Sequence, residues 1–242
     1  MSTHARLGGT AIAALLGEDS FGKTPRDIYN RIINGTRAPS SVYMRRGNAL
    51  EPEIRRRYVD TGAVIEPHPG VVHWGECFAA SVDDLRELNG VKGVVDYKSA
   101  SASASSLRKW KTGMLPSYEW QLRLYMPVFS RDEADLYVAF GLDLEGADAE
   151  ARPDGERWID EDGTVRAFEI VDTRCYTVYR DDDKERRLIT AGETFWREHI
   201  IPRLPPDYTS EHEPLPTTRI DNAALSASDL SRLEGDLSEV IA

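Results

Sequence analysis

The sequence of 242 residues is long enough for one α/β or α+β domain or for two small domains, and we expect a single domain. Hydrophobic residues make up 40% of the chain and charged residues 29%, the usage of ordinary globular proteins, which indicates neither a disordered nor a fibrous chain. No apolar run approaches the roughly 18 residues of a membrane span, and the N-terminus lacks a signal peptide's apolar core, so we expect a cytoplasmic protein that does not bind a membrane.

Charge is unevenly distributed along the chain. The net charge of -11 argues at first against a nucleic-acid partner, because phosphate binding needs local positive charge. Residues 1–131, however, carry 18 Lys and Arg against 13 Asp and Glu, whereas residues 132–242 carry 12 against 28. The first half is therefore basic, at +5, and can hold a phosphate-binding site; scattered, solvated side chains explain the asymmetry equally well.

Three helices are predicted near the N-terminus. The first covers residues 7–17, with Thr10 as its N-cap, and the second covers residues 24–35, with a proline one place into the helix. The third covers residues 45–62, where Glu51 stands at helical spacing from apolar residues and is expected to share their face.

The next stretch of the chain predicts strands. They are expected over residues 63–67, 71–81 and 93–100. The segment DLRELNG between the last two supplies the polar and glycine residues of a hairpin connection. Such a hairpin would bring Asp83, near the end of one strand, close to Asp96 on the next.

The second half of the chain alternates between strands and helices. The expected order is a Ser/Ala-rich loop at 99–106, a basic segment at 107–113, a helix at 116–126 that Pro127 ends or kinks, a strand at 135–143, an exposed excursion at 144–164, a strand at 167–180 and an amphipathic helix at 184–204. A tail at residues 209–242 is acidic and contains proline, and we expect it to be extended and weakly helical.

Asp96 and Lys98 form the pattern that points to chemistry. Residues two apart on a strand share a face, so these two side chains project together. Carboxylates on adjoining strands suit a hard cation such as Mg²⁺, which lowers the pKa of a bound water so that the water can attack a phosphate. A lysine can orient that water and offset the negative charge that develops on phosphorus. The spacing alone is weak, because Asp182 and Lys184 repeat it in a polar turn. An ordinary surface ion pair is the alternative.

Six segments, in the same order, resemble the YqaJ-type viral recombinases, the family of the phage lambda exonuclease within the PD-(D/E)XK nuclease superfamily. They are LGGTAIAALLG, RGNALEPEIRRRYVDTG, FAASVDD, GVVDYKSA, SYEWQLRLYM and TFWREHIIPRLPP, and they span roughly residues 5–208. The resemblance implies an α/β restriction-endonuclease-like fold, with a central mixed sheet flanked by helices in a domain of residues 1–208.

The same resemblance implies an activity. It is Mg²⁺- or Mn²⁺-dependent exonuclease digestion of linear double-stranded DNA from 5′ ends, with two bound ions. The product would be a 3′ single strand for a single-strand annealing recombination protein. The resemblance further implies a ring of three subunits, which for a phage protein would act in the host cytoplasm.

The resemblance assigns roles to individual residues. It implies Asp83 and Asp96 as metal ligands, the Tyr97 main-chain carbonyl as a further ligand, Lys98 as the catalytic lysine, Glu51 as the helical glutamate near the metals and Gln121 as the glutamine of a following helix. The chain departs from the family where Val82 replaces a proline, Asp84 a glycine, and Asp96 the more usual glutamate. The choice between Asp83 and Asp84 as the metal-facing carboxylate therefore stays open.

Candidate DNA contacts are less specific. Arg6 and Thr10 are nearest to the family's Arg and Ser that hold the DNA 5′-phosphate, although they lie closer together in sequence. Tyr118 precedes the glutamine at the family's spacing and is expected to contact the substrate or to shape the site. Arg108, Lys109 and Lys111 are candidates to bind the DNA backbone, with Trp110 stacking on a base; simple solvation is the alternative.

Two other functions are compatible with the sequence. One is a different nuclease of the same superfamily, either a single-strand nuclease or an endonuclease. Because Cys77 and Cys175 stand singly, an iron–sulfur nuclease, a four-cysteine zinc site and a disulfide framework are all disfavoured. The other is a non-catalytic DNA-binding protein with a degenerate site, which retention of Asp83, Asp96 and Lys98 together disfavours.

Overall fold

The computed structural model describes residues 6–36, 39–66 and 70–207. Residues Met1–Tyr208 form one compact unit, and the tail expected at 209–242 lies outside the described residues. Within the described part of the chain, no helix is both long and apolar enough to cross a membrane.

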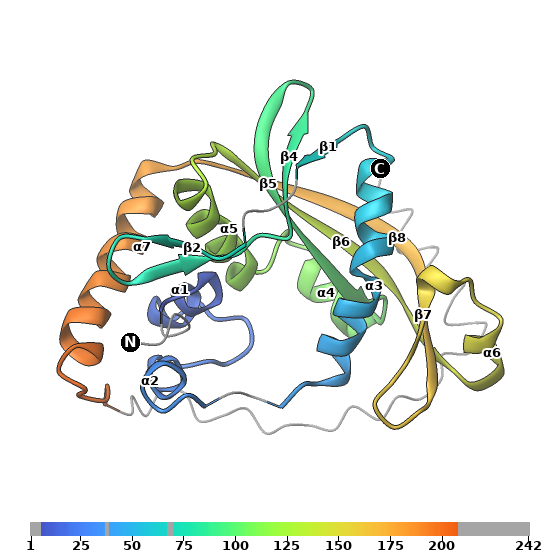
Figure 1. Ribbon diagram of the computed structural model, residues 1–242, viewed down its shortest axis with the longest axis horizontal. Coiled ribbons are helices and arrows are strands. Elements are labelled where there is room, and N and C mark those ends of the chain that lie inside the picture. The colour runs from blue at the N-terminus through green and yellow to red at the C-terminus, as the bar shows by residue number, and fades with distance from the viewer. Residues whose placement is uncertain (1–5, 37–38, 67–69, 208–242) are drawn as a thin grey trace. The chain divides into compact units, whose positions relative to one another are not determined.

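A six-stranded mixed sheet forms the centre of this unit (Figure 1). Its strands, in spatial order, are β1 (Val64–Glu66), β4 (Asp84–Leu88), β5 (Val91–Ser101), β6 (Glu133–Glu145), β8 (Val165–Tyr179) and β7 (Arg157–Ile159). The β5–β6 pair is parallel, and the other neighbours are antiparallel. A separate hairpin pairs β2 (Val72–Trp74) with β3 (Phe78–Ala80).

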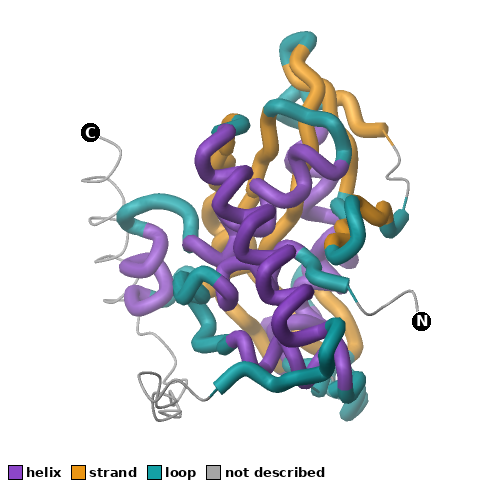
Figure 2. Tube along the Cα trace, turned by 90° about the vertical axis from the view of Figure 1, so that its left-hand side faces the viewer, coloured by secondary structure: helices purple, strands orange, loops and turns teal. Residues whose placement is uncertain are grey.

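Helices cover both faces of the long strands. They are α1 (Gly9–Leu15), α2 (Pro25–Ile33), α3 (Val42–Val59), α4 (Ala104–Trp110), α5 (Pro116–Val128), α6 (Gly146–Glu150) and α7 (Asp182–Phe195), with a 3-10 turn at Asp154–Glu156 and a π-helical turn at Trp196–Ile200. Figure 1 shows α1, α2, α5 and α7 on one side of the sheet and α3 on the other, and Figure 2 shows the helical layer in front of the strands. The mixed α/β fold class expected from the sequence is confirmed.

Local sequence explains several helix boundaries. Thr24 and Asp27 form a reciprocal capping box at the start of α2, where Pro25 occupies the first position. Ser41 caps α3 through the main-chain N–H of Met44, so this helix begins earlier than position 45. The parallel strands β5 and β6 need a crossover connection, and α4 and α5 supply it.

The pleat of β5 divides its side chains between two cores. Val94 packs with residues of α1 and α5, whereas Val95 and Tyr97 pack with Leu50 and Ile54 of α3. Because neighbouring residues on a strand point to opposite faces, Asp96 and Lys98 share the side of Val94. The sheet therefore presents Asp96 and Lys98 towards α5.

The segment expected to connect two strands is itself a strand. Asp84–Leu88 pairs with Val91–Val95, and the turn is Asn89–Gly90, with φ of 52° and 80°. Asn-Gly favours a tight two-residue hairpin because both residues tolerate positive φ. The sequence-based interpretation was wrong here because the polar residues Asp84 and Arg86 are buried with charged partners, and their polarity resembles that of a loop.

Other expectations need smaller corrections. Residues 71–81 form a hairpin with Gly75 in its turn at φ 57°, not one strand. The loop expected at 99–106 is the end of β5 and the start of α4, which Ser103 caps. The excursion at 144–164 contains α6 and β7.

Two helix ends lie at other residues than the sequence predicts. Pro127 lies in the last turn of α5, which ends at Val128. The final helix begins at Asp182 because the Asp181 side chain accepts hydrogen bonds from the main-chain N–H groups of Asp183 and Lys184.

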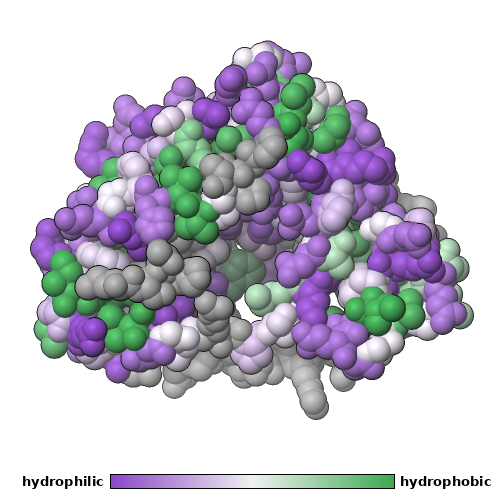
Figure 3. Space-filling view, viewed as in Figure 1, coloured by the Kyte–Doolittle hydropathy of each residue, from purple (hydrophilic) through white to green (hydrophobic). Residues whose placement is uncertain are grey.

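Hydrophilic side chains cover most of the face of the molecule in Figure 3. This face is hollowed near its centre, between the part formed by α1 and α2 and the part formed by α3.

Candidate active site

Asp96 and Lys98 form an ion pair on the α5 side of the sheet. Asp96 is 2% exposed, and the Lys98 side chain is 27% exposed. The Lys98 ammonium also donates a hydrogen bond to the main-chain carbonyl of Tyr97 at 3.1 Å. Burial by itself lowers the pKa of Lys98, but the charges of Asp96 and Asp83 outweigh it and raise that pKa, so the lysine is held as a cation.

Asp83 lies beside this pair, immediately before β4. Its Oδ2 accepts a hydrogen bond from the main-chain N–H of Tyr97 at 2.7 Å. Because Tyr97 follows Asp96 in the chain, this bond keeps the carboxylates of Asp83 and Asp96 close together. Burial, and then the charge of Asp96, raise the pKa of Asp83 to about 6.

Asp84 points to the opposite face of the sheet. Its carboxylate accepts two hydrogen bonds from Arg55, at 2.6 and 2.9 Å, and one from the Tyr97 hydroxyl at 3.0 Å. The choice that the sequence left open is thus decided by the pleat, since consecutive residues on a strand face opposite ways. Asp83, and not Asp84, joins Asp96.

Gln121 reaches the site from α5. Its Nε2 donates a hydrogen bond to Asp96 Oδ1 at 3.1 Å and another to the Tyr125 hydroxyl, while its Oε1 is buried without a hydrogen-bond partner among the described residues. Gly9 of α1 permits this approach, because a Cβ at Gly9 would lie 2.7 Å from the Gln121 Cα.

Tyr118 lies on α5, one turn before Gln121. The Lys98 ammonium lies 5.8 Å from the centre of its ring, and burial raises the pKa of its hydroxyl despite the opposing charge of Lys98. Trp110 stacks on Tyr118 at 5.7 Å and is only 4% exposed. The expectation that Trp110 stacks on a base is therefore wrong, because its ring belongs to the core.

The remaining basic candidates occupy two places. Arg108 and Lys109 are exposed in the last turn of α4, and Lys111 is exposed directly after it. Arg6 donates a hydrogen bond to the Gly75 carbonyl at 2.8 Å, and Thr10 is partly buried in the first turn of α1, which packs on α5.

Glu51 is exposed on α3. The buried stripe of this helix is formed by Leu50, Ile54 and Tyr58, so the expectation that Glu51 shares the apolar face is wrong. The helical rotation of about 100° per residue turns Glu51 away from that stripe. In the described part of the chain, no group of three His, Cys, Asp or Glu side chains is placed to hold a metal ion, so Glu51 does not complete a cluster with Asp83 and Asp96.

Comparison with known proteins identifies the fold. No family model and no curated protein matches the sequence. Solved structures do match. Among them are an alkaline exonuclease from Laribacter hongkongensis, with 20% identity over 81% of this chain and 88% of that chain at a TM-score of 0.55, and a phage-related exonuclease from Haemophilus somnus 129PT, with 17% identity over 83% of this chain and 97% of that chain at a TM-score of 0.53. This chain has the fold of these exonucleases. The restriction-endonuclease-like architecture expected from the sequence is thereby confirmed.

On this exonuclease fold, the site offers oxygen atoms suited to a hard cation. Mg²⁺ and Mn²⁺ prefer carboxylate and carbonyl oxygens. The candidate ligands are the carboxylates of Asp83 and Asp96 and the carbonyl of Tyr97, and Oε1 of the neighbouring Gln121 has no hydrogen-bond partner among the described residues. A buried amide oxygen without a partner is costly, and a bound cation or its water would satisfy it. The residues present therefore fit such a metal.

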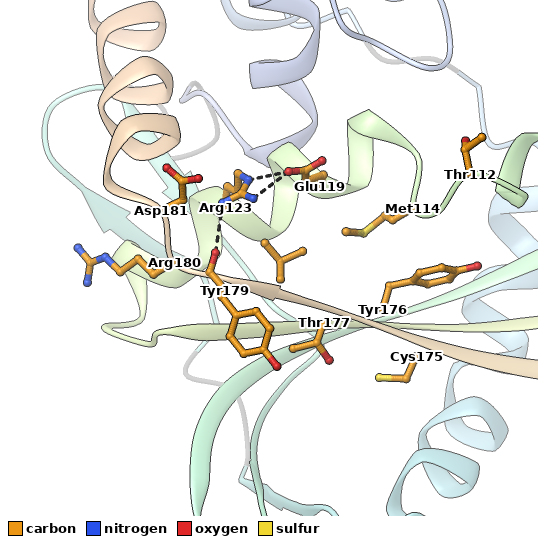
Figure 4. Close-up of a pocket in the computed structure, with 11 residues that line it drawn as sticks. Thr112, Met114, Glu119, Arg123, Cys175, Tyr176, Thr177, Tyr179, Arg180 and Asp181 are labelled. Atoms are coloured by element: carbon orange, nitrogen blue, oxygen red, sulfur yellow. Dashed lines mark hydrogen bonds and ion pairs between the residues drawn. The ribbon is translucent and has the colours of Figure 1, made fainter.

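A separate open pocket of about 710 Å³ lies between the start of α5 and the end of β8 (Figure 4). The ion pair between Glu119 and Arg123 lies along one wall, and Arg123 also donates to the Tyr179 carbonyl at 3.3 Å. The lining contains none of the predicted site residues. The cavity and the candidate active site of the exonuclease fold are therefore distinct.

Sequence reasoning missed two partners of the site. The Tyr125 hydroxyl accepts a hydrogen bond from Gln121. Residues four apart on a helix share a face, so the spacing of these two could have indicated the contact. Arg55 bonds to Asp84 across 29 residues, and no local pattern indicates that contact.

Proposed function

We propose that this protein is a metal-dependent DNA exonuclease that hydrolyses linear double-stranded DNA. The observation that carries this proposal is the contact of the Lys98 ammonium with Asp96, beside Asp83, on a fold shared with two named exonucleases. The Asp96 carboxylate is buried and Asp83 is partly buried. Burying these charged groups is costly, and an ordinary surface ion pair would not need the burial.

The residues have separate tasks in the proposed reaction. Asp83, Asp96 and the Tyr97 carbonyl would hold Mg²⁺ or Mn²⁺, as one ion or two. When bound, the metal would lower the pKa of water and neutralise charge on the phosphate. Lys98, kept cationic by its neighbours, would orient the attacking water and offset the negative charge that develops on phosphorus. Gln121 would hold Asp96 in position through its amide.

The finer features of the activity are also proposals. We infer digestion from the 5′ end, a 3′ single-stranded product passed to an annealing recombination protein, and a ring of three subunits, all from the family resemblance. The Laribacter enzyme has also been crystallised with dAMP, which supports release of mononucleotides here. Labels at either DNA end test the polarity, and the mass in solution tests the ring.

One digestion experiment separates the candidate functions. Linear duplex, closed circular and single-stranded DNA are incubated with Mg²⁺ or EDTA, using the wild type, Lys98→Ala and the control Lys92→Ala, which removes an exposed lysine from the same strand. We expect Mg²⁺-dependent loss of linear duplex that Lys98→Ala abolishes and Lys92→Ala retains.

Other outcomes contradict the proposal. Nicking of closed circles would indicate an endonuclease, and preference for single strands a single-strand nuclease. DNA binding without cleavage under any metal would indicate a non-catalytic protein. Full activity of Lys98→Ala would refute the site assignment.

A further inference from the structure

Tyr97 is held from both faces of the sheet by two consecutive aspartates. On the α5 face, Asp83 accepts a hydrogen bond from the Tyr97 main-chain N–H at 2.7 Å. On the α3 face, Asp84 accepts a hydrogen bond from the Tyr97 hydroxyl at 3.0 Å. One short segment before and within β4 thus fixes both the backbone and the ring of a residue on β5.

Asp84 is itself rigidly held. Its side chain is 4% exposed and receives both Arg55 hydrogen bonds in a bidentate arrangement, which is geometrically specific. The Tyr97 ring packs edge-on against Tyr58, with ring centres 5.9 Å apart, and is 6% exposed. The hydroxyl of Tyr97 therefore has a fixed acceptor, and its ring has little freedom to turn.

The fixed ring determines where the Tyr97 peptide groups lie. The N–H on one side of this residue orients Asp83, and the carbonyl on the other side accepts the Lys98 hydrogen bond at 3.1 Å. A rotation of Tyr97 would displace both groups together. We propose that Asp84, supported by Arg55, is a positioning residue that acts through the Tyr97 hydroxyl to set the oxygen atoms of the metal site.

This inference rests on the proposed function, since it assigns Asp84 a part in the same site without contact with metal or substrate. Partners that orient ligands from behind typically change metal affinity by about 10- to 100-fold when removed. Because Asp84 acts through one intervening residue, we expect the lower end of that range, about threefold to tenfold.

The chain provides a matched control. Tyr58 is also buried, at 1% exposure, and its hydroxyl also donates to a buried aspartate, Asp135, at 2.6 Å. It lies in the same core as Tyr97, but among the described residues its hydroxyl bonds to Asp135 and not to Asp83 or Lys98. Tyr58→Phe and Tyr97→Phe therefore remove similar hydroxyl groups at similar structural cost.

The test measures Mn²⁺ binding without DNA, by electron paramagnetic resonance of free Mn²⁺, in the wild type, Tyr97→Phe, Asp84→Asn and Tyr58→Phe. Melting temperature shows that each variant is folded, and hydrogen exchange of the Tyr97 amide reports its bond to Asp83 independently of metal. We expect weaker Mn²⁺ binding and faster Tyr97 exchange in Tyr97→Phe and Asp84→Asn, with Tyr58→Phe within twofold of the wild type.

Equal effects of Tyr58→Phe and Tyr97→Phe on Mn²⁺ affinity would mean that the Tyr97 hydroxyl contributes only to the general packing of the core, and would overturn the inference. Unchanged Mn²⁺ affinity and exchange in both Tyr97→Phe and Asp84→Asn would do the same, while leaving the proposed function intact if the wild type binds Mn²⁺ and cleaves DNA. A wild type that neither binds Mn²⁺ nor cleaves DNA would overturn both.

Discussion

Asp83 and Tyr97 are joined by a hydrogen bond from the Tyr97 main-chain N–H to Asp83 Oδ2, at 2.7 Å. This bond links the entry of β4 to the middle of β5 and places two acidic side chains, Asp83 and Asp96, next to one lysine. Two carboxylates so close together repel each other when both are ionised. Burial of Asp83 adds to this cost, and the Lys98 cation offsets it only in part, so ionised Asp83 is expected to be unfavourable until a metal cation binds.

The first prediction concerns pH and stability in metal-free protein. The pKa of Asp83 is raised by burial from 3.8 to about 6, so the folded state keeps a proton that the unfolded state loses between pH 4 and 6. Asp83 thus favours the folded state at low pH, and this contribution is lost as pH rises through 6. In EDTA, Asp83→Asn should raise the free energy of unfolding by about 1–3 kcal/mol above pH 6.5 and by little at pH 4.

Urea denaturation at the two pH values measures this difference. Asp19→Asn serves as the control, because Asp19 lies in the loop before α2, where its carboxylate accepts hydrogen bonds from the Phe21 main-chain N–H and the Ser117 hydroxyl, away from the Asp83–Asp96 pair. A loss of stability in Asp83→Asn at pH 7, with EDTA present, would contradict the predicted cost of ionising Asp83 in the folded state.

The second prediction concerns the contact between α1 and α5. A Cβ at Gly9 would lie 2.7 Å from the Gln121 Cα, whereas one at Gly8 would meet only the Ala79 carbonyl at 3.8 Å. Gly9→Ala should therefore push α5 and Gln121 away from Asp96, destabilising the protein by about 1–3 kcal/mol and lowering the rate of DNA cleavage. Gly8→Ala is the control and should change neither quantity appreciably. Equal melting temperatures and rates for the two variants would contradict the close packing.

The third prediction compares two neighbouring arginines of α3. Arg55 pairs with the buried carboxylate of Asp84, whereas Arg56 pairs with Glu53 and Asp60 and is 59% exposed. Arg55→Ala would leave the Asp84 carboxylate without its charge partner and should lower the free energy of unfolding by about 1–3 kcal/mol. This loss is smaller than for a fully buried ion pair, because Arg55 is half exposed. Arg56→Ala should cost much less, because exposed ion pairs contribute little to stability. Chemical denaturation of both variants measures the contrast, and a larger loss in Arg56→Ala would refute it.

The fourth prediction concerns the exposed basic side chains at the end of α4. Replacing Arg108, Lys109 and Lys111 with Ala should raise KM for duplex DNA with little change in kcat, because these side chains are proposed to bind the DNA backbone away from the reacting bond. The salt dependence of binding should fall by about one unit of slope for each lost phosphate contact.

The control for this prediction removes the same charge elsewhere. The control residues are exposed: Lys92 on β5, Arg186 in α7 and Arg197 in the π-helical turn after α7. Replacing all three with Ala lowers the net charge by the same amount. If both triple variants weaken DNA binding alike, the effect is one of overall charge, and α4 is not a DNA contact.

The sequence alone determined the elements with strong local signals. The proline at the start of the helix expected at residues 24–35 and the alternation of Val94, Val95, Asp96 and Lys98 are short-range patterns, and the structure shows the helix and the strand that they predict. The same alternation placed Asp96 and Lys98 on one face, since the period of a strand is fixed by its backbone. Order and spacing also carried the family resemblance from which the fold was expected.

Tertiary structure alone decided which polar residues are buried. Asp84 and Arg86 look like loop residues in sequence, but distant charges satisfy them inside the sheet: Arg55 for Asp84, and Asp135 for Arg86. The choice of Asp83 over Asp84 needed the register of β4 against β5, because a shift of one residue would exchange their faces. Burial and charge pairing depend on contacts between residues far apart in the chain, and no local pattern encodes them.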